Sequence, residues 1–226
     1  MELAPSDIDG ILVSHHHGDH GGGAELAMRR WGIPVYANAR TAEELGISEH
    51  EGFHAFESLE ILEPLPDVHL LPFPVPHAGA DNVGFTLSTR DGYRAAVVTD
   101  LGSFTDEVVQ HLADCAHISI EANYDVDRLT RGPYPQSLKR RIMDRGGHLS
   151  NEQTGALLAR VVGPATQSIV LSHLSIENNR PHLAESTVLY HIDEVFSGQI
   201  AISLQDGPDF SHFLGQTETE RLCVET

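Results

Sequence analysis

The sequence predicts an α/β fold in a single domain. Short apolar runs bounded by polar or glycine-containing turns alternate along the chain with segments whose apolar residues recur at helical spacing. The chain has 226 residues, of which 40% are hydrophobic and 21% charged, which is typical of a folded domain and excludes a fully disordered or fibrous protein. We see no internal repeat and no low-complexity linker that would divide it.

The first part of the chain predicts two strands and two helices. Residues 8–14 are an apolar run that ends in a polar loop, the pattern of a buried strand. A second segment begins with three glycines and continues with apolar residues at helical spacing. Thr41, with Glu44 three positions later, forms a capping box for a short helix. The predicted elements are a strand at 8–14, a helix at 21–31, a strand at 34–37 and a short helix from residue 41.

The remainder continues the alternation. Five prolines between residues 64 and 76 indicate short extended pieces such as edge strands, and Asp91-Gly92 is typical of a hairpin turn. Ser150 with Gln153 forms another capping box, and a proline opens the last helix. The predicted elements are hairpin strands at 83–88 and 94–99, helices at 105–113, 134–145, 150–162 and 181–196, and strands at 117–121, 167–172 and 199–204.

Composition narrows the possible partners. The chain carries 14 basic and 33 acidic residues, a net charge of −19, so any phosphate-binding site must be local. Cys115 and Cys223 are too few and too far apart for a disulfide framework or a thiolate metal site. No stretch approaches the roughly 18 apolar residues of a membrane helix, and the N-terminus lacks the pattern of a signal peptide. We expect a cytoplasmic protein without a membrane partner.

Histidine is the unusual residue, with 15 copies against a single lysine. The segment Ser14-His-His-His-Gly-Asp-His20 places imidazoles and a carboxylate directly after a predicted strand. A loop at a strand end can direct alternate side chains at one point, so His15 and His17 can share one metal ion while Asp19 and His20 reach a second. An expression-tag remnant or a solvated turn fits this alternation with Gly and Asp less well.

Three further segments complete a known pattern. His77 lies in Pro-His-Ala-Gly-Ala-Asp-Asn, Asp100 in Val-Val-Thr-Asp-Leu-Gly and His173 in Leu-Ser-His-Leu-Ser, each at a predicted strand end. Together with His-x-His-x-Asp-His, this order resembles the metallo-β-lactamase superfamily. The resemblance implies an αββα sandwich, with a metallo-β-lactamase-fold hydrolase domain over residues 1–214 and a C-terminal tail over 215–226.

A subgroup is also indicated. Glu-Ala-Asn-Tyr-Asp at 121–125, Tyr-Pro-Gln-Ser-Leu-Lys-Arg-Arg-Ile at 134–142, Gly-His-Leu-Ser-Asn-Glu at 147–152 and His-Leu-Ser-Ile-Glu-Asn-Asn at 173–179 resemble the YycJ/WalJ (VicX) group. The studied members of that group are DNA exonucleases. Tyr124 stands where the group usually has histidine. The group also begins earlier, so we expect a chain that is N-terminally truncated relative to the family and lacks its first strands.

The resemblance implies a dinuclear site. His15, His17 and His77 would bind one ion, Asp19, His20 and His173 the other, and Asp100 would bridge them. We expect two divalent cations, zinc or manganese, because nitrogen and carboxylate ligands without cysteine suit either. Such a pair can hold a bridging hydroxide that attacks a phosphodiester. Judged alone, His77 could be a loop residue, Asp100 a turn cap and His173 a hydrogen-bonded core histidine.

Two further sets of residues bear on catalysis and on the substrate. Glu121 and His148 resemble a glutamate–histidine pair of the related ribonuclease Z enzymes, which makes His148 a candidate general acid beside Glu121 and Asp19. Residues 128–145 hold six of the 14 basic residues. Within this stretch we expect phosphate binding by Lys139, Arg140, Arg141 and Arg145, although a merely solvated helix stays open.

The sequence therefore favours a metal-dependent phosphodiesterase acting on nucleic acid, most simply a DNA exonuclease. One alternative is a hydrolase of a small phosphodiester, thioester or lactam. Another is an inactive truncated remnant, which metal analysis would identify. The metal, the polarity of digestion, the choice of DNA over RNA and the oligomeric state are not given by the sequence.

Overall fold

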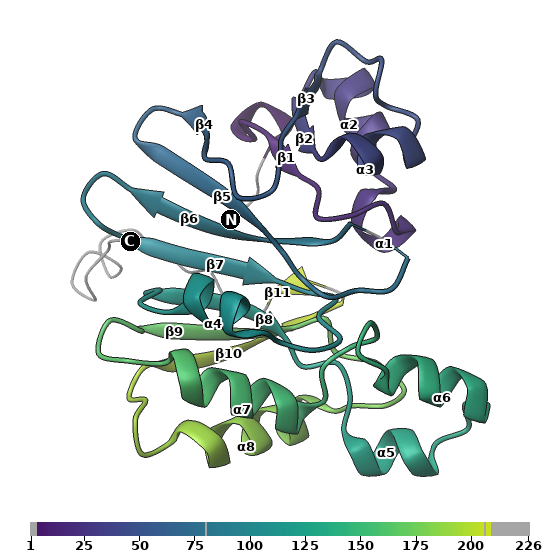
Figure 1. Cartoon of the computed structure of the whole chain (residues 1–226), viewed down its shortest axis with the longest axis vertical. Helices are drawn as coiled ribbons and strands as arrows, with labels where there is room; N and C mark the ends of the chain where they lie inside the picture. Colours follow the sequence, from purple (N-terminus) through teal and green to yellow (C-terminus); the bar gives the residue numbers. More distant parts are fainter. Residues whose placement is uncertain (1–3, 80, 206, 209–226) are drawn as a thin grey trace.

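The computed structural model describes residues 4–79, 81–205 and 207–208. The expected tail at 215–226 and the last residues of the expected domain lie outside this part of the chain. Two β-sheets form the centre of the molecule (Figure 1). None of the helices in the described ranges combines the length and hydrophobicity that a bilayer span requires.

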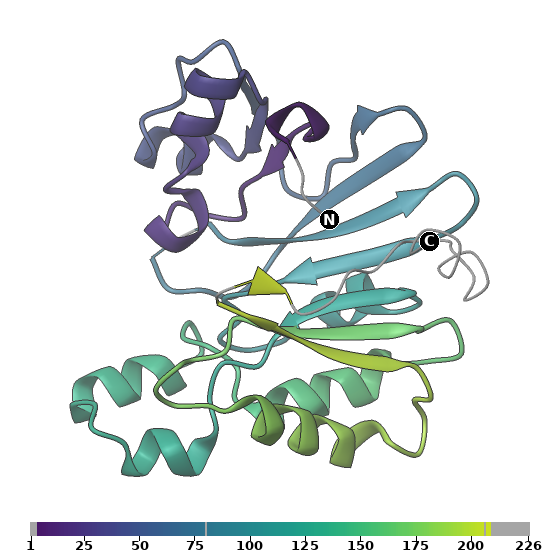
Figure 2. The ribbon, with the colours of Figure 1, turned by 180° about the vertical axis from the view of Figure 1, so that it is seen from behind.

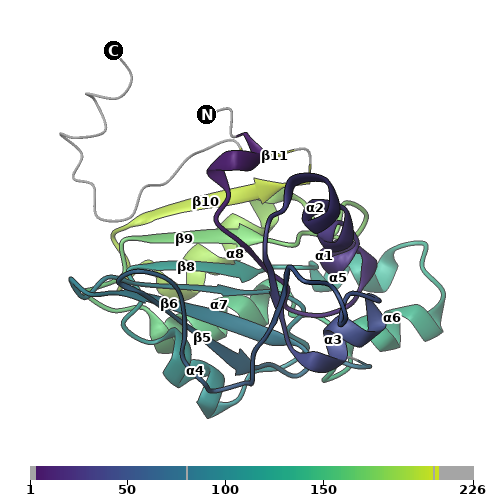
Figure 3. The ribbon, with the colours of Figure 1, turned by 90° about the horizontal axis from the view of Figure 1, so that it is seen from above.

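The larger sheet has eight strands in the order β11-β10-β9-β8-β7-β6-β5-β4. Strands β4 to β7 pair antiparallel as a meander, β7 to β10 pair parallel, and β11 returns antiparallel to β10. Figure 3 shows β10 to β5 side by side. The strands are β4 (Leu62–Leu65), β5 (Val68–Pro74), β6 (Val83–Thr89), β7 (Arg94–Val98), β8 (His117–Glu121), β9 (Ser168–Ser172), β10 (Gln199–Leu204) and β11 (Gly207–Pro208).

The smaller sheet contains β1 (Ile11–Leu12), β2 (Val35–Ala37) and β3 (Phe53–Ala55), all parallel. Helices α2 (Ala24–Trp31) and α3 (Ala39–Glu44) cover its outer side, where Met28 and Ala42 pack on Val35. Between the sheets, Phe56, Val83 and Phe85 form a cluster with residues of β1, β2 and β4. Two short helical segments flank β1 in the chain, η1 (Pro5–Asp7) before it and α1 (Gly18–Gly21) after it.

The main core lies on the other face of the large sheet. Ile118, Ile120, Ile169 and Leu171 from the central strands pack against Leu157 and other residues of the covering helices. These helices are α4 (Asp106–Leu112), α7 (Asn151–Val161) and α8 (Pro181–Ile192). Figure 2 shows the purple N-terminal unit and the green helices on opposite sides of the sheet. The layers are therefore helix, sheet, sheet and helix, which confirms the expected αββα fold.

A pair of short helices lies beside the end of the large sheet (Figure 1). They are α5 (Val126–Arg131) and α6 (Gln136–Met143). Asp125 caps α5 by accepting a hydrogen bond from the backbone N–H of Arg128. The sequence predicted α6 but not α5, whose six residues are too few for a clear amphipathic pattern. Strand β3, at three residues, was missed for the same reason.

Other predicted boundaries need correction. The strand expected at 8–14 keeps only Ile11 and Leu12, and the helix expected at 21–31 begins at Ala24 as α2, after the separate short helix α1. The cap of α3 is Asn38, whose side chain accepts a hydrogen bond from the N–H of Thr41. In contrast, Ser150 and Gln153 form the predicted capping box of α7.

The proline-rich segment was expected to form short extended pieces such as edge strands, but it also contributes an inner strand of the large sheet. Strand β5 contains Pro72 and Pro74 but lies between β4 and β6. Its pairing with β4 ends at the Leu62–Leu70 pair, so both prolines lie beyond it. The carbonyl of Pro72 accepts a hydrogen bond from the N–H of Leu59 on the side away from β6, so the missing proline N–H removes no bond to β6.

The parallel strands converge at one edge. Strands β7, β8 and β9 are parallel neighbours, and their carboxyl ends lead to Asp100, Glu121 and His173. The loop after β1 carries His15 and His17. Loops at the carboxyl ends of parallel strands are common positions for functional side chains.

The core around α7 supports this edge of the sheet, so removing a buried side chain from it should destabilise the domain. Leu157 is fully buried in it. We expect Leu157→Ala to lower the free energy of unfolding by about 2–5 kcal/mol, because it removes buried methyl groups and leaves a cavity. Leu26, which is 55% exposed on α2, supplies the matched control, and Leu26→Ala should change stability by less than about 0.5 kcal/mol. Urea denaturation measures both, and equal midpoints would contradict this assignment of the core.

Candidate metal centre

The seven predicted metal ligands meet at the edge between the two sheets. Their side-chain nitrogen and oxygen atoms form overlapping groups in which all atoms lie within 4.8 Å of one another. The groups are His15/His17/His77, His15/His20/Asp100, Asp19/His20/His173 and Asp100/Glu121/His148/His173. These side chains come from loops separated by up to 158 positions in the chain, from His15 to His173.

The first group is made of imidazoles that face one another. His15 Nε2 lies 2.8 Å from His17 Nδ1, and His77 Nε2 lies 3.4 Å from the same atom. Burial, with the neighbouring His20, lowers the pKa of His15 to about 3, and burial also lowers the pKa of His77. Both rings are therefore neutral near pH 7, which is the state that binds a metal ion.

Asp100 joins this group to the second. Its Oδ2 atom lies 2.7 Å from His20 Nε2 and 3.7 Å from His173 Nε2, while Oδ1 lies 3.8 Å from His77 Nε2. Burial alone would raise the pKa of Asp100, but its contact with His20 and the nearby His173 hold that pKa below its usual range. The carboxylate is ionised and faces imidazoles on both sides.

These atoms fit divalent cations. His20 Nε2 and Asp100 Oδ2 are both buried and lie 2.7 Å from each other, but neither makes a hydrogen bond of regular geometry to any described residue. Buried polar atoms are normally hydrogen-bonded, so this close contact leaves both atoms able to turn to a cation. The donors are imidazole nitrogens and carboxylate oxygens, which zinc and manganese accept.

Asp19 and His173 complete the second group. The side chain of Asp19 is 70% exposed, and its Oδ2 lies 3.8 Å from His173 Nε2. Burial opposes a charge on His173, but the hydrogen bond to Glu121 and the charge of Asp100 raise its pKa to about 9. A cation that binds His173 Nε2 at neutral pH must therefore displace a proton.

Glu121 forms hydrogen bonds to several loops of the site. Its carboxylate is fully buried at the end of β8 and accepts hydrogen bonds from the backbone N–H groups of Asp100, Leu101 and Leu149. Its Oε2 lies 3.2 Å from Nδ1 of both His148 and His173. Burial would raise the pKa of Glu121, but the hydrogen bonds from these two rings lower it. No part of the Glu121 side chain is exposed.

The predicted Glu121–His148 pair is thus brought together, and a second partner for Glu121 emerges. Sequence reasoning missed its bond to His173. Carboxylates that orient a ligand histidine in this way tune metal sites. His77 has an equivalent support, since its Nδ1 lies 3.2 Å from the carbonyl oxygen of Gly147.

Two of these residues have a strained backbone. Asp100 has a φ of 55° and His173 a φ of 54°, in the left-handed region that residues other than glycine seldom adopt. Each is located just after a parallel strand. Such strain persists where the surrounding structure enforces it, and it is concentrated at functional sites.

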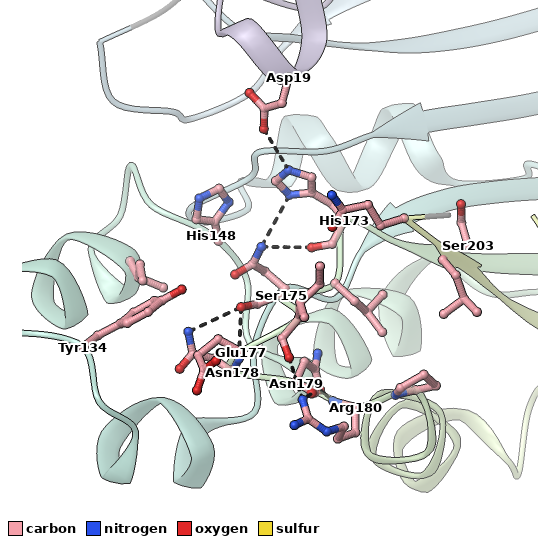
Figure 4. Close-up of a pocket in the computed structure, with 17 residues that line it drawn as sticks. Asp19, Tyr134, His148, His173, Ser175, Glu177, Asn178, Asn179, Arg180 and Ser203 are labelled. Carbon is pink, nitrogen blue, oxygen red and sulfur yellow. Dashed lines mark hydrogen bonds and ion pairs between the residues drawn. The ribbon is translucent and has the colours of Figure 1, made fainter. Parts of the chain in front are cut away.

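A cleft of about 1060 Å³ opens from the second group. Asp19, His148 and His173 line its metal-centre end, and it extends past the loop after His173 to Arg180 and Leu204 (Figure 4). The side chain of His148 is 22% exposed. With its Nδ1 directed at Glu121, the imidazole has Nε2 left to meet a molecule in the cleft.

Of the four residues predicted to bind phosphate, three are exposed and one is buried. Arg140, Arg141 and Arg145 are exposed. Lys139 is a correction: its side chain is buried, and Nζ donates hydrogen bonds to the carbonyl oxygens of Thr130 and Gly132 at 2.8 and 2.7 Å. An ammonium group satisfied inside the protein is not available to a phosphate, so Lys139 leaves the set.

Several supporting residues were not predicted. Asn123 donates a hydrogen bond to the carbonyl oxygen of His173, and Thr154 donates one to that of Glu121. Asn151 and Asn179 exchange two side-chain hydrogen bonds in the buried layer behind them. Tyr124, the predicted departure from the group, is buried, and burial raises its pKa.

The chain is similar to known proteins in both sequence and fold. A family model described as a beta-lactamase superfamily domain matches residues 2–174. The chain is 32% identical over 198 residues to exodeoxyribonuclease YycJ of Bacillus anthracis, covering 85% of this chain and 74% of the relative. It is 33% identical over 200 residues to exodeoxyribonuclease WalJ of Streptococcus pneumoniae serotype 2, covering 86% and 74%.

Solved structures agree in fold. Zn²⁺-bound PqqB from Methylobacterium extorquens has a TM-score of 0.65 at 18% identity, with 87% of this chain and 71% of that chain covered. The short form of human tRNase Z has a TM-score of 0.56 at 17% identity, covering 77% and 75%. At these identities the likeness describes the fold alone.

The role of Glu121 can be tested by removing its charge. We expect Glu121→Gln to lower the free energy of unfolding by about 2–4 kcal/mol, because an amide cannot accept all five hydrogen bonds. Zinc affinity should fall about 10- to 100-fold. Urea denaturation and metal titration measure the two effects.

Glu152→Gln is the matched control, since Glu152 pairs with His191 at 2.8 Å and its side chain is 64% exposed. It should alter neither quantity appreciably. Similar effects in the two variants would show that Glu121 has no special role.

Proposed function

Because this chain belongs to the beta-lactamase superfamily and, within it, to the YycJ/WalJ group, we propose that it is a DNA exonuclease that uses two divalent metal ions. Its fold and its relatives make it a metal-dependent hydrolase. The proposal goes further in the number of ions, in DNA as the substrate and in the role of each residue. A cytoplasmic location, which suits a DNA substrate, is part of it.

One observation carries the two-ion proposal. The two oxygens of the Asp100 carboxylate lie near different imidazoles: Oδ2 is 2.7 Å from His20 Nε2, and Oδ1 is 3.4 Å from His148 Nδ1 and 3.8 Å from His77 Nε2. A carboxylate placed in this way can join two ion sites. We assign His15, His17 and His77 to one ion, Asp19, His20 and His173 to the other, and Asp100 to both. A pair of cations so held would supply an activated water and neutralise the charge of a phosphodiester.

The protein's own groups account for the rest of the reaction. Glu121 holds Nδ1 of His148, which leaves Nε2 toward the cleft. A phosphodiester bound beside the ions would place its departing oxygen within reach of this nitrogen, and a protonated His148 would donate its proton there. Asp19 is exposed at the same end of the cleft, so a substrate that enters the cleft there would meet it.

Local charge favours a polymer over a small phosphodiester. The cleft, of about 1060 Å³, is at the upper limit of the usual range for sites of small ligands, about 300–1,000 Å³. Arg140 and Arg141 lie on α6 and Arg145 just after it, and Tyr134, which lines the cleft, lies just before the same helix. With a net charge of −19 over the chain, these cations are a local attraction for phosphates. The curated relatives, both named exodeoxyribonucleases, support DNA.

The assay uses end-labelled single- and double-stranded oligonucleotides with manganese or zinc. The wild-type protein should shorten them progressively from an end, and EDTA should stop the reaction until metal is restored. Asp100→Ala should reduce the rate more than about 100-fold. Loss of a ligand that both ions share should reduce activity more than loss of a group that only supports a ligand, which typically costs about 10- to 100-fold. Asp193→Ala, an exposed residue after α8, is the control. Equal rates for Asp100→Ala and wild type would refute the proposal.

The arginine set predicts a salt effect. Replacing Arg141 and Arg145 with Gln should reduce the slope of log affinity against log salt concentration by about 0.7–0.9 for each phosphate that the protein no longer neutralises. Arg29→Gln, at an exposed position on α2, should leave the slope unchanged. Fluorescence anisotropy with a labelled oligonucleotide at several salt concentrations measures it. An unchanged slope in the double variant would remove these arginines from the DNA-binding surface.

A further inference from the structure

Tyr134 is the aromatic ring of the cleft. It is the only Phe, Tyr or Trp among the described residues that line it. Figure 4 shows the ring projecting from the α6 side, with His148 above it and Asn178 below. The side chain is half-buried, so one part of the ring is supported by the protein and another is open to a molecule in the cleft.

The turn that carries Tyr134 is unusually constrained. Pro133 and Pro135 flank it, and each proline ring restricts the backbone. Gly132 approaches its neighbours so closely that a Cβ atom there would lie 2.7 Å from the carbonyl oxygen of Arg128 and 3.1 Å from Asn178 Oδ1. The buried ammonium of Lys139 ties the carbonyl oxygens of Thr130 and Gly132 together. The backbone that carries the ring is thus held in place before any ligand binds.

Away from the metal centre the cleft is lined mainly by uncharged residues, and Glu177 and Arg180 are its charged members there. Asn123, Ser175 and Asn178 contribute amides and a hydroxyl, while Ile142 and Ile176 contribute apolar surface. Such a lining suits the face and edge of a nucleobase better than it suits a phosphate, which prefers cations. The carboxylates and imidazoles of the metal centre occupy only one end.

We propose that Tyr134 stacks on the base of the terminal nucleotide and that Lys139 positions the tyrosine by fixing its turn. This inference rests on the proposed function, because it concerns how the same site recognises its substrate. Stacking on an aromatic side chain tolerates any base and requires that base to be unpaired. The enzyme therefore engages a frayed or single-stranded end, and the metal centre receives the neighbouring phosphodiester.

The test compares two single-stranded oligonucleotides, one with ordinary termini and one with an abasic residue at each end. Tyr134→Ala should lower kcat/KM on the ordinary substrate about 5- to 150-fold, mainly through KM. On the abasic substrate it should have little effect on the first cleavage, which removes a terminal residue that has no base to stack. Tyr134→Phe keeps the ring and should behave like wild type. Tyr190→Ala, at an 82% exposed tyrosine on α8, is the matched control.

Lys139→Met tests the positioning role. It keeps a long apolar side chain but cannot donate to the two carbonyl oxygens, so it should lower kcat/KM on the ordinary substrate and spare the abasic one. A thermal melt establishes whether this variant folds. If it does not fold, the Tyr134 variants, whose side chain is half-buried, decide the matter.

The outcomes are separable. Equal losses for Tyr134→Ala on both substrates, or no loss on either, would overturn the stacking role while leaving the exonuclease proposal intact. A loss in Tyr134→Phe as large as in Tyr134→Ala would assign the effect to the hydroxyl group and overturn stacking. If the wild-type protein degrades neither oligonucleotide with manganese or zinc, the proposed function itself fails, and this inference fails with it.

Discussion

The site depends on one buried carboxylate. Glu121 brings an ionised group into the interior, where a charge is tolerated only when it is fully hydrogen-bonded. Its partners are the backbone of the Asp100 loop, the backbone after His148, and the rings of His148 and His173. Three loops that are remote in sequence are thereby fixed to one another. The strained backbones of Asp100 and His173 are held by these contacts.

The layered fold supplies the remaining geometry. Parallel pairing of β7, β8 and β9 brings three loops to one edge, and the small sheet presents the histidine-rich loop from the opposite side. The cores on either face of the large sheet maintain this arrangement. Beyond the metal centre, the α5–α6 turn and the loop after β9 form the cleft walls, and the loop after β9 carries both His173 and residues that line the cleft.

Much of this could be predicted from the sequence, because strand and helix periods, caps and the histidine motif are local signals. The hairpin of β6 and β7 and the capping box of α7 agree with the prediction. The seven candidate ligands lie near one another, and their role as metal ligands stays a prediction. Long-range contacts set the rest. Nothing near Lys139 in the sequence shows that its ammonium is buried against backbone carbonyls, and nothing near Glu121 shows that it also reaches His173. Likewise, Pro72 is acceptable inside the sheet only because β4 is short.

The central claim is that Asp100 lies between two divalent cations held by the surrounding histidines and Asp19. Anomalous diffraction from crystals grown with manganese or zinc, recorded on both sides of the metal absorption edge, tests it most directly. Two peaks should appear, one among His15, His17 and His77 and one among Asp19, His20 and His173, each adjacent to an oxygen of Asp100. A single peak, or peaks only at other places on the protein, would contradict the account.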